Sequence, residues 1–374
     1  MKYYLIAGEA SGDLHGALLM KELKKKDPEA AFRFWGGDLM KAEGGSLVKH
    51  YKELAFMGFV EVLSNIKAIL KNIRLCKEDI DVFQPDAIIY IDYPGFNFRI
   101  MKWAKIKGYR NHYYISPQIW AWKEGRIKAI KRDVDQMYVI LPFEKDFYEQ
   151  KHQFPVHFVG HPLIDAIAQR KTVDHIKFLA TYHLDERPLI ALLPGSRKQE
   201  IKKMLSVMLD MVDRYPDYQF IIAGAPGQDE SFYSSYLKDY PVTLVMNRTY
   251  DLMSLCHAAL VTSGTATLET ALFKVPQVVC YKGSSISYHI AKRIVKLDYI
   301  SLVNLIMDQP VVTELIQSAF NKKTLRKELD LILHPTQRNR IFADYYELET
   351  KLGGTGASEN TASLIFTDIK NLQQ

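Results

Sequence analysis

Polar, glycine-containing segments follow several apolar, strand-like runs, and open α/β sheets bind ligands at the carboxyl ends of their strands. Tyr3–Ala7 runs into Gly8–Asp13, whose glycines permit a tight turn. Ser11 or Asp13 can cap the helix that follows and leave amide groups pointed at a ligand. Helix capping alone would explain such a turn, but Glu9 adds a carboxylate at the strand end and favours a ligand site.

A second carboxylate, Asp92, follows the apolar run Ala87–Ile91, next to a turn that Pro94 stiffens. A base at a strand end takes the proton from an attacking hydroxyl and contributes typically ~10²- to 10⁴-fold to the rate. Asp92 is therefore the candidate general base. A role as a turn or helix-capping residue fits the spacing equally well.

Two loops in the second half of the chain could bind an anion. Leu189–Leu193 runs into Pro194–Arg197, where the glycine allows close approach, the serine donates and the arginine offers a bidentate fork. Ala258–Thr262 runs into Ser263–Glu269, where an opening helix presents free N–H groups and the glutamate can bind ribose hydroxyls. Two such loops at successive strand ends indicate a nucleoside diphosphate; simple helix capping is the alternative.

The sequence lacks a Walker A pattern, which argues against a P-loop ATPase or kinase. Its D-x-D triplets, Asp79–Asp81 and Asp133–Asp135, lie in ordinary charged stretches, so no metal site is predicted. The charge on a departing nucleoside diphosphate would then be stabilised by helix N-termini and Arg197, without a metal or another cofactor.

The composition fits a folded protein of two domains. The chain of 374 residues is longer than a domain with one hydrophobic core usually is. Its content of 48% hydrophobic and 25% charged residues is typical of globular proteins. Cys76, Cys256 and Cys280 are widely spaced, as in proteins of a reducing compartment. The first predicted strand follows Lys2 immediately, which leaves no room for a signal peptide, and no apolar run is long enough to span a membrane. The sequence therefore predicts a cytoplasmic protein.

The net charge of +6 belongs mostly to the first half of the chain. Arg99–Arg132 carries ten basic residues and one acid, Glu124. Such a segment attracts phosphate groups, although a solvated helix face explains it equally well. Nucleic-acid-binding motifs are absent, so we expect no nucleic-acid partner.

Apolar runs alternate with helical patterns along the chain, which predicts parallel sheets with crossover helices. The series pauses over a polar helical stretch, Asp165–His183. We predict Rossmann-like domains over 1–170 and 171–345 and a terminal segment over 346–374, packed back or exchanged in a dimer. The expected strands are Tyr3–Ala7, Ala87–Ile91, Asn111–Ile115, Gln136–Ile140, Leu189–Leu193, Gln219–Ala223, Ala258–Thr262 and Val275–Cys280.

Met57–Arg74 has the pattern of an amphipathic helix with basic residues at its edge. Such a helix can lie in a membrane interface, but a core-facing helix has the same periodicity and is the better interpretation on the residues alone. The aromatic cluster Trp120–Trp122 likewise fits either an acceptor-binding surface or a core anchor.

Taken together, these segments resemble the lipid-A-disaccharide synthase family over nearly the whole chain. The S-P-x-x-W-A-W and D-x-P-x-F-N segments are far more specific than the glycine loops. The matching segments are Ala7–Asp13, Met57–Leu63, Ile91–Asn97, Ser116–Trp122, Phe158–Leu163, Leu193–Arg197, Ser263–Glu269 and Leu302–Leu305.

The resemblance implies a GT-B fold, in which two Rossmann-like domains with parallel sheets face a central cleft. It implies an inverting, metal-independent transfer of 2,3-diacylglucosamine from its UDP donor to the 6-hydroxyl of 2,3-diacylglucosamine 1-phosphate. The products would be lipid A disaccharide 1-phosphate and UDP. The resemblance also implies a peripheral membrane enzyme of lipopolysaccharide synthesis that binds the anionic cytoplasmic face of the inner membrane. Family members can form homodimers that exchange C-terminal segments, so the Gly353–Gly356 loop is a candidate hinge.

Carried onto matching positions, the resemblance makes Asp92 the catalytic base and Glu9 an active-site carboxylate, without deciding which of them takes the proton. Arg197 and Asn304 become active-site polar groups, and Glu269 becomes a ligand of the UDP ribose. The resemblance also favours membrane contact for the amphipathic helix.

The family often has a second acid where this chain has Gly95, which weakens a catalytic scheme with two neighbouring carboxylates.

Two larger sets of residues complete the prediction. The substrate-binding set is Gly8, Ser11, Gly12, Asp13, Gly195, Ser196, Ser263, Gly264, Thr265, Thr267 and Glu269. The membrane-contacting set is Val60, Val62, Leu63, Ile66, Ile69 and Leu70.

The alternative enzyme is a UDP-N-acetylglucosamine 2-epimerase, which shares the fold and the nucleotide loops but needs no lipid acceptor. Interconversion of the donor alone would favour the epimerase. A requirement for a second, acylated sugar would favour transfer.

Overall fold

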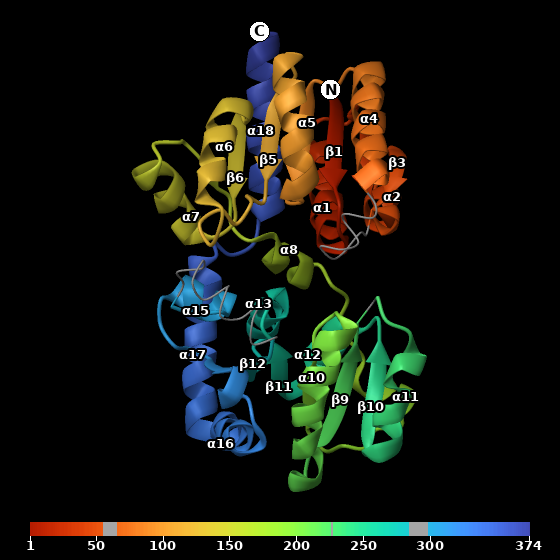
Figure 1. Ribbon diagram of the computed structural model, residues 1–374, viewed down its shortest axis with the longest axis vertical. Helices are drawn as coiled ribbons and strands as arrows, with labels where there is room; N and C mark the ends of the chain where they lie inside the picture. The colour runs from red at the N-terminus through yellow and green to blue at the C-terminus, as the bar shows by residue number, and fades with distance from the viewer. Residues whose placement is uncertain (55–65, 226, 284–297) are drawn as a thin grey trace. The chain divides into compact units, whose positions relative to one another are not determined.

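The computed structural model describes the chain except residues 55–65, 226 and 284–297. The chain divides into two compact units, one of Met1–Gln169 with Leu352–Gln374 and one of Arg170–Lys351. Each unit is built on one parallel sheet (Figure 1). The second unit continues to Lys351, past the predicted limit at residue 345.

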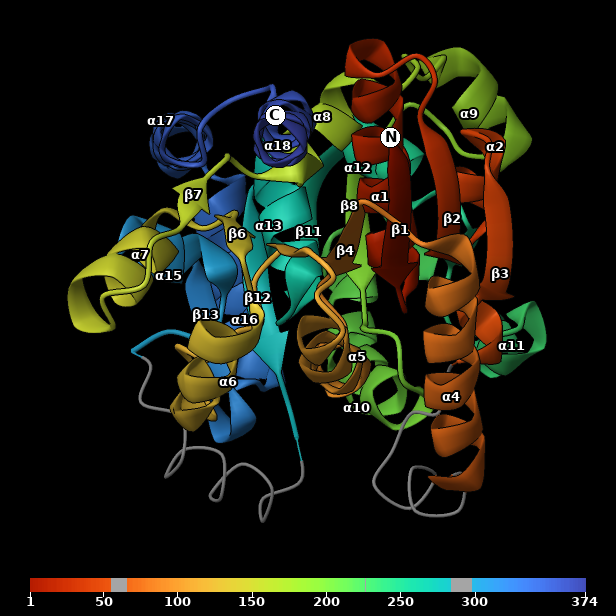
Figure 2. The same ribbon diagram turned by 90° about the horizontal axis from the view of Figure 1, so that it is seen from above.

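The first unit contains a seven-stranded sheet in the order β3-β2-β1-β4-β5-β6-β7. Its strands are β1 (Lys2–Ala7), β2 (Ala31–Gly36), β3 (Ser46–His50), β4 (Ala87–Ile91), β5 (Asn111–Tyr114), β6 (Gln136–Val139) and β7 (His157–Phe158). Its helices are α1 (Ala10–Lys26), α2 (Asp38–Ala42), α4 (Ile66–Phe83), α5 (Pro94–Ile106), α6 (Ile127–Asp133), α7 (Pro142–Asp146), α8 (Pro162–Ala168) and α18 (Ala357–Gln373). Helices α4, α5 and α6 cover one face of the sheet, and α1, α8 and α18 cover the other (Figure 2).

The second unit contains a six-stranded sheet in the order β10-β9-β8-β11-β12-β13. Its strands are β8 (Leu189–Leu193), β9 (Gln219–Gly224), β10 (Val242–Met246), β11 (Cys256–Thr262), β12 (Gln277–Tyr281) and β13 (Thr313–Ile316). Its helices are α9 (His175–Thr181), α10 (Lys198–Met208), α11 (Glu230–Asp239), α12 (Thr249–Leu255), α13 (Thr265–Leu272), α15 (Leu302–Met307), α16 (Lys322–Leu333) and α17 (Pro335–Lys351).

In each unit the first strand lies inside the sheet, and the next two strands are added on one side of it. The chain then returns and adds the remaining strands on the other side. The reversal falls between β1 and β4 in the first unit and between β8 and β11 in the second. Ligands of doubly wound sheets bind at the strand ends beside such a reversal. Pairing of Ala7 with Ile91 places Gly8 beside Asp92 at this point of the first sheet. Each unit thus positions its candidate loops where the topology favours a ligand.

The C-terminal segment completes the first unit. Asp165 in α8 accepts hydrogen bonds from the backbone N–H groups of Gly356 (2.6 Å) and Ser358 (2.9 Å) at the start of α18. Farther along α18, Asp368 pairs with the Arg110 guanidinium through two bonds of 2.8 and 2.7 Å. These contacts hold α18 at both ends.

All eight predicted strands are present, but the structure adds β2, β3, β7, β10 and β13. Four of these five, β3, β7, β10 and β13, are the edge strands of the two sheets and have partly exposed residues. The fifth, β2, is interrupted by Arg33, so none of the five is a continuous apolar run. Residues 57–65 of the predicted helix Met57–Arg74 lie outside the described residues, and its predicted C-terminal end is wrong, because α4 continues to Phe83. Every helix among the described residues is too short or too polar to cross a membrane.

Candidate active site

Asp92 stands in a strained turn that the surrounding backbone holds firmly. Asp92 and Tyr93 both have a φ of +46°, in the left-handed region that non-glycine residues rarely adopt. The Asp92 carbonyl accepts hydrogen bonds from the Asn97 amide (2.6 Å) and the Tyr113 hydroxyl (2.7 Å), while its N–H donates to Tyr114 O (3.1 Å). Such strain persists where neighbours fix the backbone, and it often marks a functional site. These bonds use the Asp92 backbone, and no side chain among the described residues donates a hydrogen bond to its carboxylate.

The surroundings of Asp92 suit a proton acceptor. Its half-buried carboxyl has a pKa raised to about 6, mainly because burial disfavours the charged form and secondly because of the nearby Glu9 charge. A general base works best when its pKa lies near the operating pH. Asp92 is therefore ionised at neutral pH and still basic enough to accept a proton.

The glycines of the first loop allow close packing. A Cβ on Gly8 would lie 2.4 Å from the ring of Tyr93, which stacks on Phe96. A Cβ on Gly12 would come within 3.1 Å of the Ala7 side chain. Glu9 lies beside them as the N-cap residue of α1, with an exposed side chain that makes no capping bond. The loop therefore brings Glu9 and the Asp92 turn together.

Asp13 departs from the prediction. Its carboxylate, 3% exposed, accepts hydrogen bonds from the backbone N–H groups of Gly37 (2.7 Å), Leu39 (3.1 Å) and Met40 (3.0 Å). It therefore caps α2 rather than its own helix. We leave Asp13 out of the proposed substrate site, because both carboxylate oxygens are already bound within the chain.

The segment Ser116–Trp122 is held by a residue that the sequence analysis did not single out. Glu144, 1% exposed, accepts hydrogen bonds from the Ser116 hydroxyl (2.5 Å) and the Trp120 indole N–H (3.1 Å). Its other oxygen accepts the backbone N–H groups of Ile140 (3.1 Å) and Leu141 (2.9 Å). Burial raises the Glu144 pKa. Ser116 and Trp120 of this segment thus bind one buried carboxylate, whose charge also contributes to the raised pKa of Asp92.

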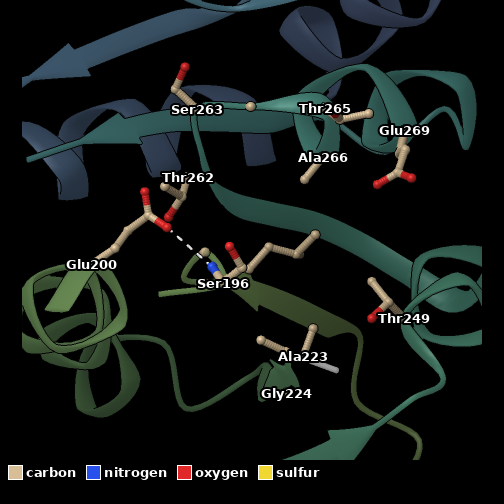
Figure 3. Close-up of a pocket in the computed structure, with 14 residues that line it drawn as sticks. Ser196, Glu200, Ala223, Gly224, Thr249, Thr262, Ser263, Thr265, Ala266 and Glu269 are labelled. Carbon is tan, nitrogen blue, oxygen red and sulfur yellow. Dashed lines mark hydrogen bonds between the residues drawn. The ribbon is translucent and has the colours of Figure 1, made fainter. Parts of the chain in front are cut away.

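A pocket of about 360 Å³ opens at the strand ends of the second sheet (Figure 3). Pockets of this size bind small ligands and cofactors. Both predicted anion loops contribute to it. The lining residues are Leu193, Gly195, Ser196, Glu200, Ala223, Gly224, Ala225, Thr249, Thr262, Ser263, Gly264, Thr265, Ala266 and Glu269. The structure therefore brings together six of the predicted substrate-binding residues.

Glu269 lines this pocket from the first turns of α13. Its carboxylate accepts a hydrogen bond of 2.6 Å from the Tyr250 hydroxyl. Burial raises the Glu269 pKa, and the bond from Tyr250 partly offsets that effect. A carboxylate oriented by one hydroxyl can accept further hydroxyl donors, as the ribose of a nucleotide offers.

Two predicted polar groups are bound within the chain instead. The Asn304 amide, 1% exposed, donates to Val312 O (2.9 Å) and Glu314 Oε1 (2.9 Å), and its oxygen accepts Val312 N–H (2.9 Å). The Thr267 hydroxyl is fully buried and donates to Gly264 O (2.8 Å). Both side chains thus position the backbone around the loops, and their contact with substrate stays a prediction.

Arg197 is exposed as the N-cap residue of α10 and does not line the pocket. The D-x-D aspartates serve elsewhere: Asp79 pairs with Arg33, and Asp135 pairs with Lys105 and Arg110. The described residues contain no cluster of three potential metal-ligating side chains.

Part of the predicted membrane-contacting set can be placed. Val60, Val62 and Leu63 lie outside the described residues, as does the side chain of Ile66. Ile69 is partly buried against the core of the first unit, whereas Leu70 is 59% exposed. Ile69 thus faces mainly inward, and Leu70 faces outward from the same helix.

The chain matches a family model described as lipid-A-disaccharide synthetase over residues 3–366. It belongs to this family. A lipid-A-disaccharide synthase of Geobacter metallireducens is 39% identical over 369 residues, covering 96% of this chain and 95% of that protein. One of Syntrophus aciditrophicus is 40% identical over 375 residues, covering 98% and 97%. The predicted enzyme class, a glycosyltransferase of lipid A biosynthesis, is thereby confirmed.

Among solved structures, a UDP-GlcNAc 2-epimerase from Neisseria meningitidis bound to UDP-GlcNAc has a TM-score of 0.72 at 14% identity. The match covers 98% of this chain and all of that one. At this identity the likeness concerns the fold alone and confirms the predicted GT-B class. The epimerase alternative is supported only at the level of the fold.

Proposed function

We propose that this enzyme transfers 2,3-diacylglucosamine from UDP-2,3-diacylglucosamine to the 6-hydroxyl of 2,3-diacylglucosamine 1-phosphate and releases UDP. The family match over residues 3–366 carries the proposal. The raised pKa of the Asp92 carboxylate and the pocket lined by Glu269 support it, because transfer needs a proton acceptor and a nucleotide site.

In the proposed reaction, Asp92 takes the proton of the acceptor 6-hydroxyl while its oxygen attacks the anomeric carbon of the donor. The bond from that carbon to the diphosphate oxygen breaks, and UDP leaves with the electron pair. Attack from the face opposite UDP inverts the anomeric configuration. The N–H groups at the start of α13 would stabilise the departing diphosphate, since helix N-termini favour anions. Arg197 lies outside the pocket lining but follows Ser196 in the same loop, and its contact with the diphosphate stays a prediction.

The test supplies purified protein with both acylated sugars in detergent and EDTA. We expect disaccharide and UDP in equal amounts even with EDTA present, because each transfer releases one UDP and the proposed mechanism needs no cation. Omission of the acceptor should leave the donor unchanged. Epimerised donor without acceptor would support the alternative enzyme, and no product from protein that binds UDP would overturn the proposed acceptor.

Peripheral binding to an anionic membrane is part of the same proposal. The exposed side chain of Leu70 on α4 is surrounded by the exposed cations Lys67, Lys71 and Arg74 at helical spacing. Apolar groups flanked by basic ones bind membrane interfaces by burial and charge attraction together. This face of α4 therefore suits an acidic lipid surface.

Leu70→Ser should weaken binding to vesicles that contain anionic lipid by about fivefold to tenfold, because a leucine loses the apolar area that it would bury. Cosedimentation with such vesicles measures the effect. Val82→Ser is the matched control, since Val82 is 78% exposed near the other end of the same helix. Equal loss in both variants would contradict the assigned face.

A homodimer with exchanged C-terminal segments stays a prediction. Asp165 binds the start of α18, and Asp368 of α18 pairs with Arg110. These contacts define the surface that an exchanged segment would occupy. The molar mass in solution, measured by light scattering, tests it, and a monomer at all concentrations would contradict it.

A further inference from the structure

The anion loop after β8 already carries a negatively charged acceptor. Glu200, in the first turn of α10, reaches back so that its Oε2 accepts the backbone N–H of Ser196 at 3.1 Å (Figure 3). Gly195 makes room for this contact: it has a φ of +100°, and a Cβ there would lie 2.2 Å from the same oxygen. The N–H group expected to meet a phosphate is thus occupied by a carboxylate.

Glu200 also lines the pocket to which the proposed function assigns UDP. One N–H cannot donate fully to a carboxylate and to a phosphate oxygen, and two anions at contact distance repel each other strongly. Binding of a diphosphate at Ser196 therefore requires the Glu200 carboxylate to move away. Glu269 accepts the Tyr250 hydroxyl and not the Ser196 N–H, so Glu269 is not the group displaced.

Thr262 offers a place for the displaced carboxylate. This last residue of β11 is 4% exposed and lines the same pocket, and its buried hydroxyl has no hydrogen-bond partner among the described residues. Buried hydroxyls are normally paired, so an unpaired one that lines a pocket points to a ligand or a second conformation. Leu193 pairs with Val261, which places Thr262 beside the start of the loop that Glu200 caps.

We propose that Glu200 is a positioning residue that exchanges its partner when the donor binds. In the structure its carboxylate holds the Ser196 N–H, and when the donor binds, the diphosphate takes that N–H while Glu200 accepts the Thr262 hydroxyl. The inference rests on the proposed function for its ligand. A carboxylate that competes for the phosphate site weakens UDP binding, which favours release of this product after transfer.

The first test titrates UDP and uridine into the wild type and Glu200→Gln, with EDTA present. Glutamine keeps an acceptor oxygen for Ser196 but lacks the charge, so UDP should bind about tenfold more tightly. Uridine has no phosphate and should bind equally to both proteins. A ratio of UDP to uridine affinity that stays the same or falls in the variant would overturn the proposal.

The second test asks whether Thr262 acts through Glu200. Thr262→Val should weaken UDP binding about fivefold in the wild type and less than about twofold in Glu200→Gln, because only a displaced carboxylate needs the hydroxyl. The melting temperature of Thr262→Val should not fall without UDP, since the hydroxyl has no hydrogen-bond partner among the described residues to lose. Equal effects on UDP binding in both backgrounds would refute the exchange.

These titrations separate the two proposals. A wild type that binds UDP but makes no disaccharide contradicts the proposed reaction, and the affinity ratios still decide the role of Glu200. A wild type that does not bind UDP contradicts both.

Discussion

Asp92→Asn should lower disaccharide formation by about 10²- to 10⁴-fold, because asparagine cannot accept the proton of the acceptor hydroxyl. In the wild type, activity should fall as the pH drops through about 6, where the raised pKa of Asp92 lets its carboxylate take up a proton. Initial rates between pH 5 and 8 measure both effects. Activity retained in Asp92→Asn and lost in Glu9→Gln would instead make Glu9 the proton acceptor.

The same substitution should leave the fold intact or stabilise it. Folding raises the pKa of Asp92, so the ionised carboxylate destabilises the folded protein. This destabilisation grows as the pH rises from the ordinary pKa of an aspartate to about 6. Asparagine removes this cost above that range. A higher melting temperature at pH 8 with a far lower rate would separate catalysis from folding, and a lower melting temperature would contradict the assigned burial effect.

Glu9→Gln provides a second check on this site. The Glu9 charge contributes to the raised pKa of Asp92, so its removal should lower that pKa. The acid limb of the pH–rate profile should then move to lower pH. An acid limb at an unchanged pH would mean that a group other than Asp92 controls it.

Glu144→Leu should lower the free energy of unfolding by about 3 to 5 kcal/mol, as expected when one partner of a buried charged network is removed. Four donors would lose their acceptor: the Ser116 hydroxyl, the Trp120 indole and the N–H groups of Ile140 and Leu141. Buried donors without partners carry the full cost of lost hydration. Denaturant unfolding of the purified variant measures the change.

Glu78→Leu is the control for this prediction, because Glu78 is exposed and only weakly paired with Arg74 at 3.9 Å. Its stability should differ little from that of the wild type. Destabilisation of the same size in both variants would mean that a leucine at any of these glutamates is harmful. In that case the network around Glu144 would carry no special role.

The order of apolar runs and polar strand ends accounts for much of the fold and of the candidate site. Buried parallel strands must be continuously apolar, so the strands at the centre of each sheet are visible in the sequence, and so are the loops that follow them. Asp92, Gly195 and Glu269 were found in this way, because each lies directly after a central strand or within the first turns of the next helix. The edge strands were missed because their half-exposed residues give no such run.

The amino-acid order by itself determined the two doubly wound sheets and the loops at their reversal points, since both depend on local patterns of apolar and turn residues. The tertiary structure decided which polar side chains in those loops are free. Asp13 is bound by Gly37, and Asn304 by Glu314, while Glu144 and Glu200 turned out to hold the loops. Hydrogen-bond partners brought close by folding, some of them distant in sequence, leave no periodic signal, so only the folded chain shows which carboxylates remain available to a substrate.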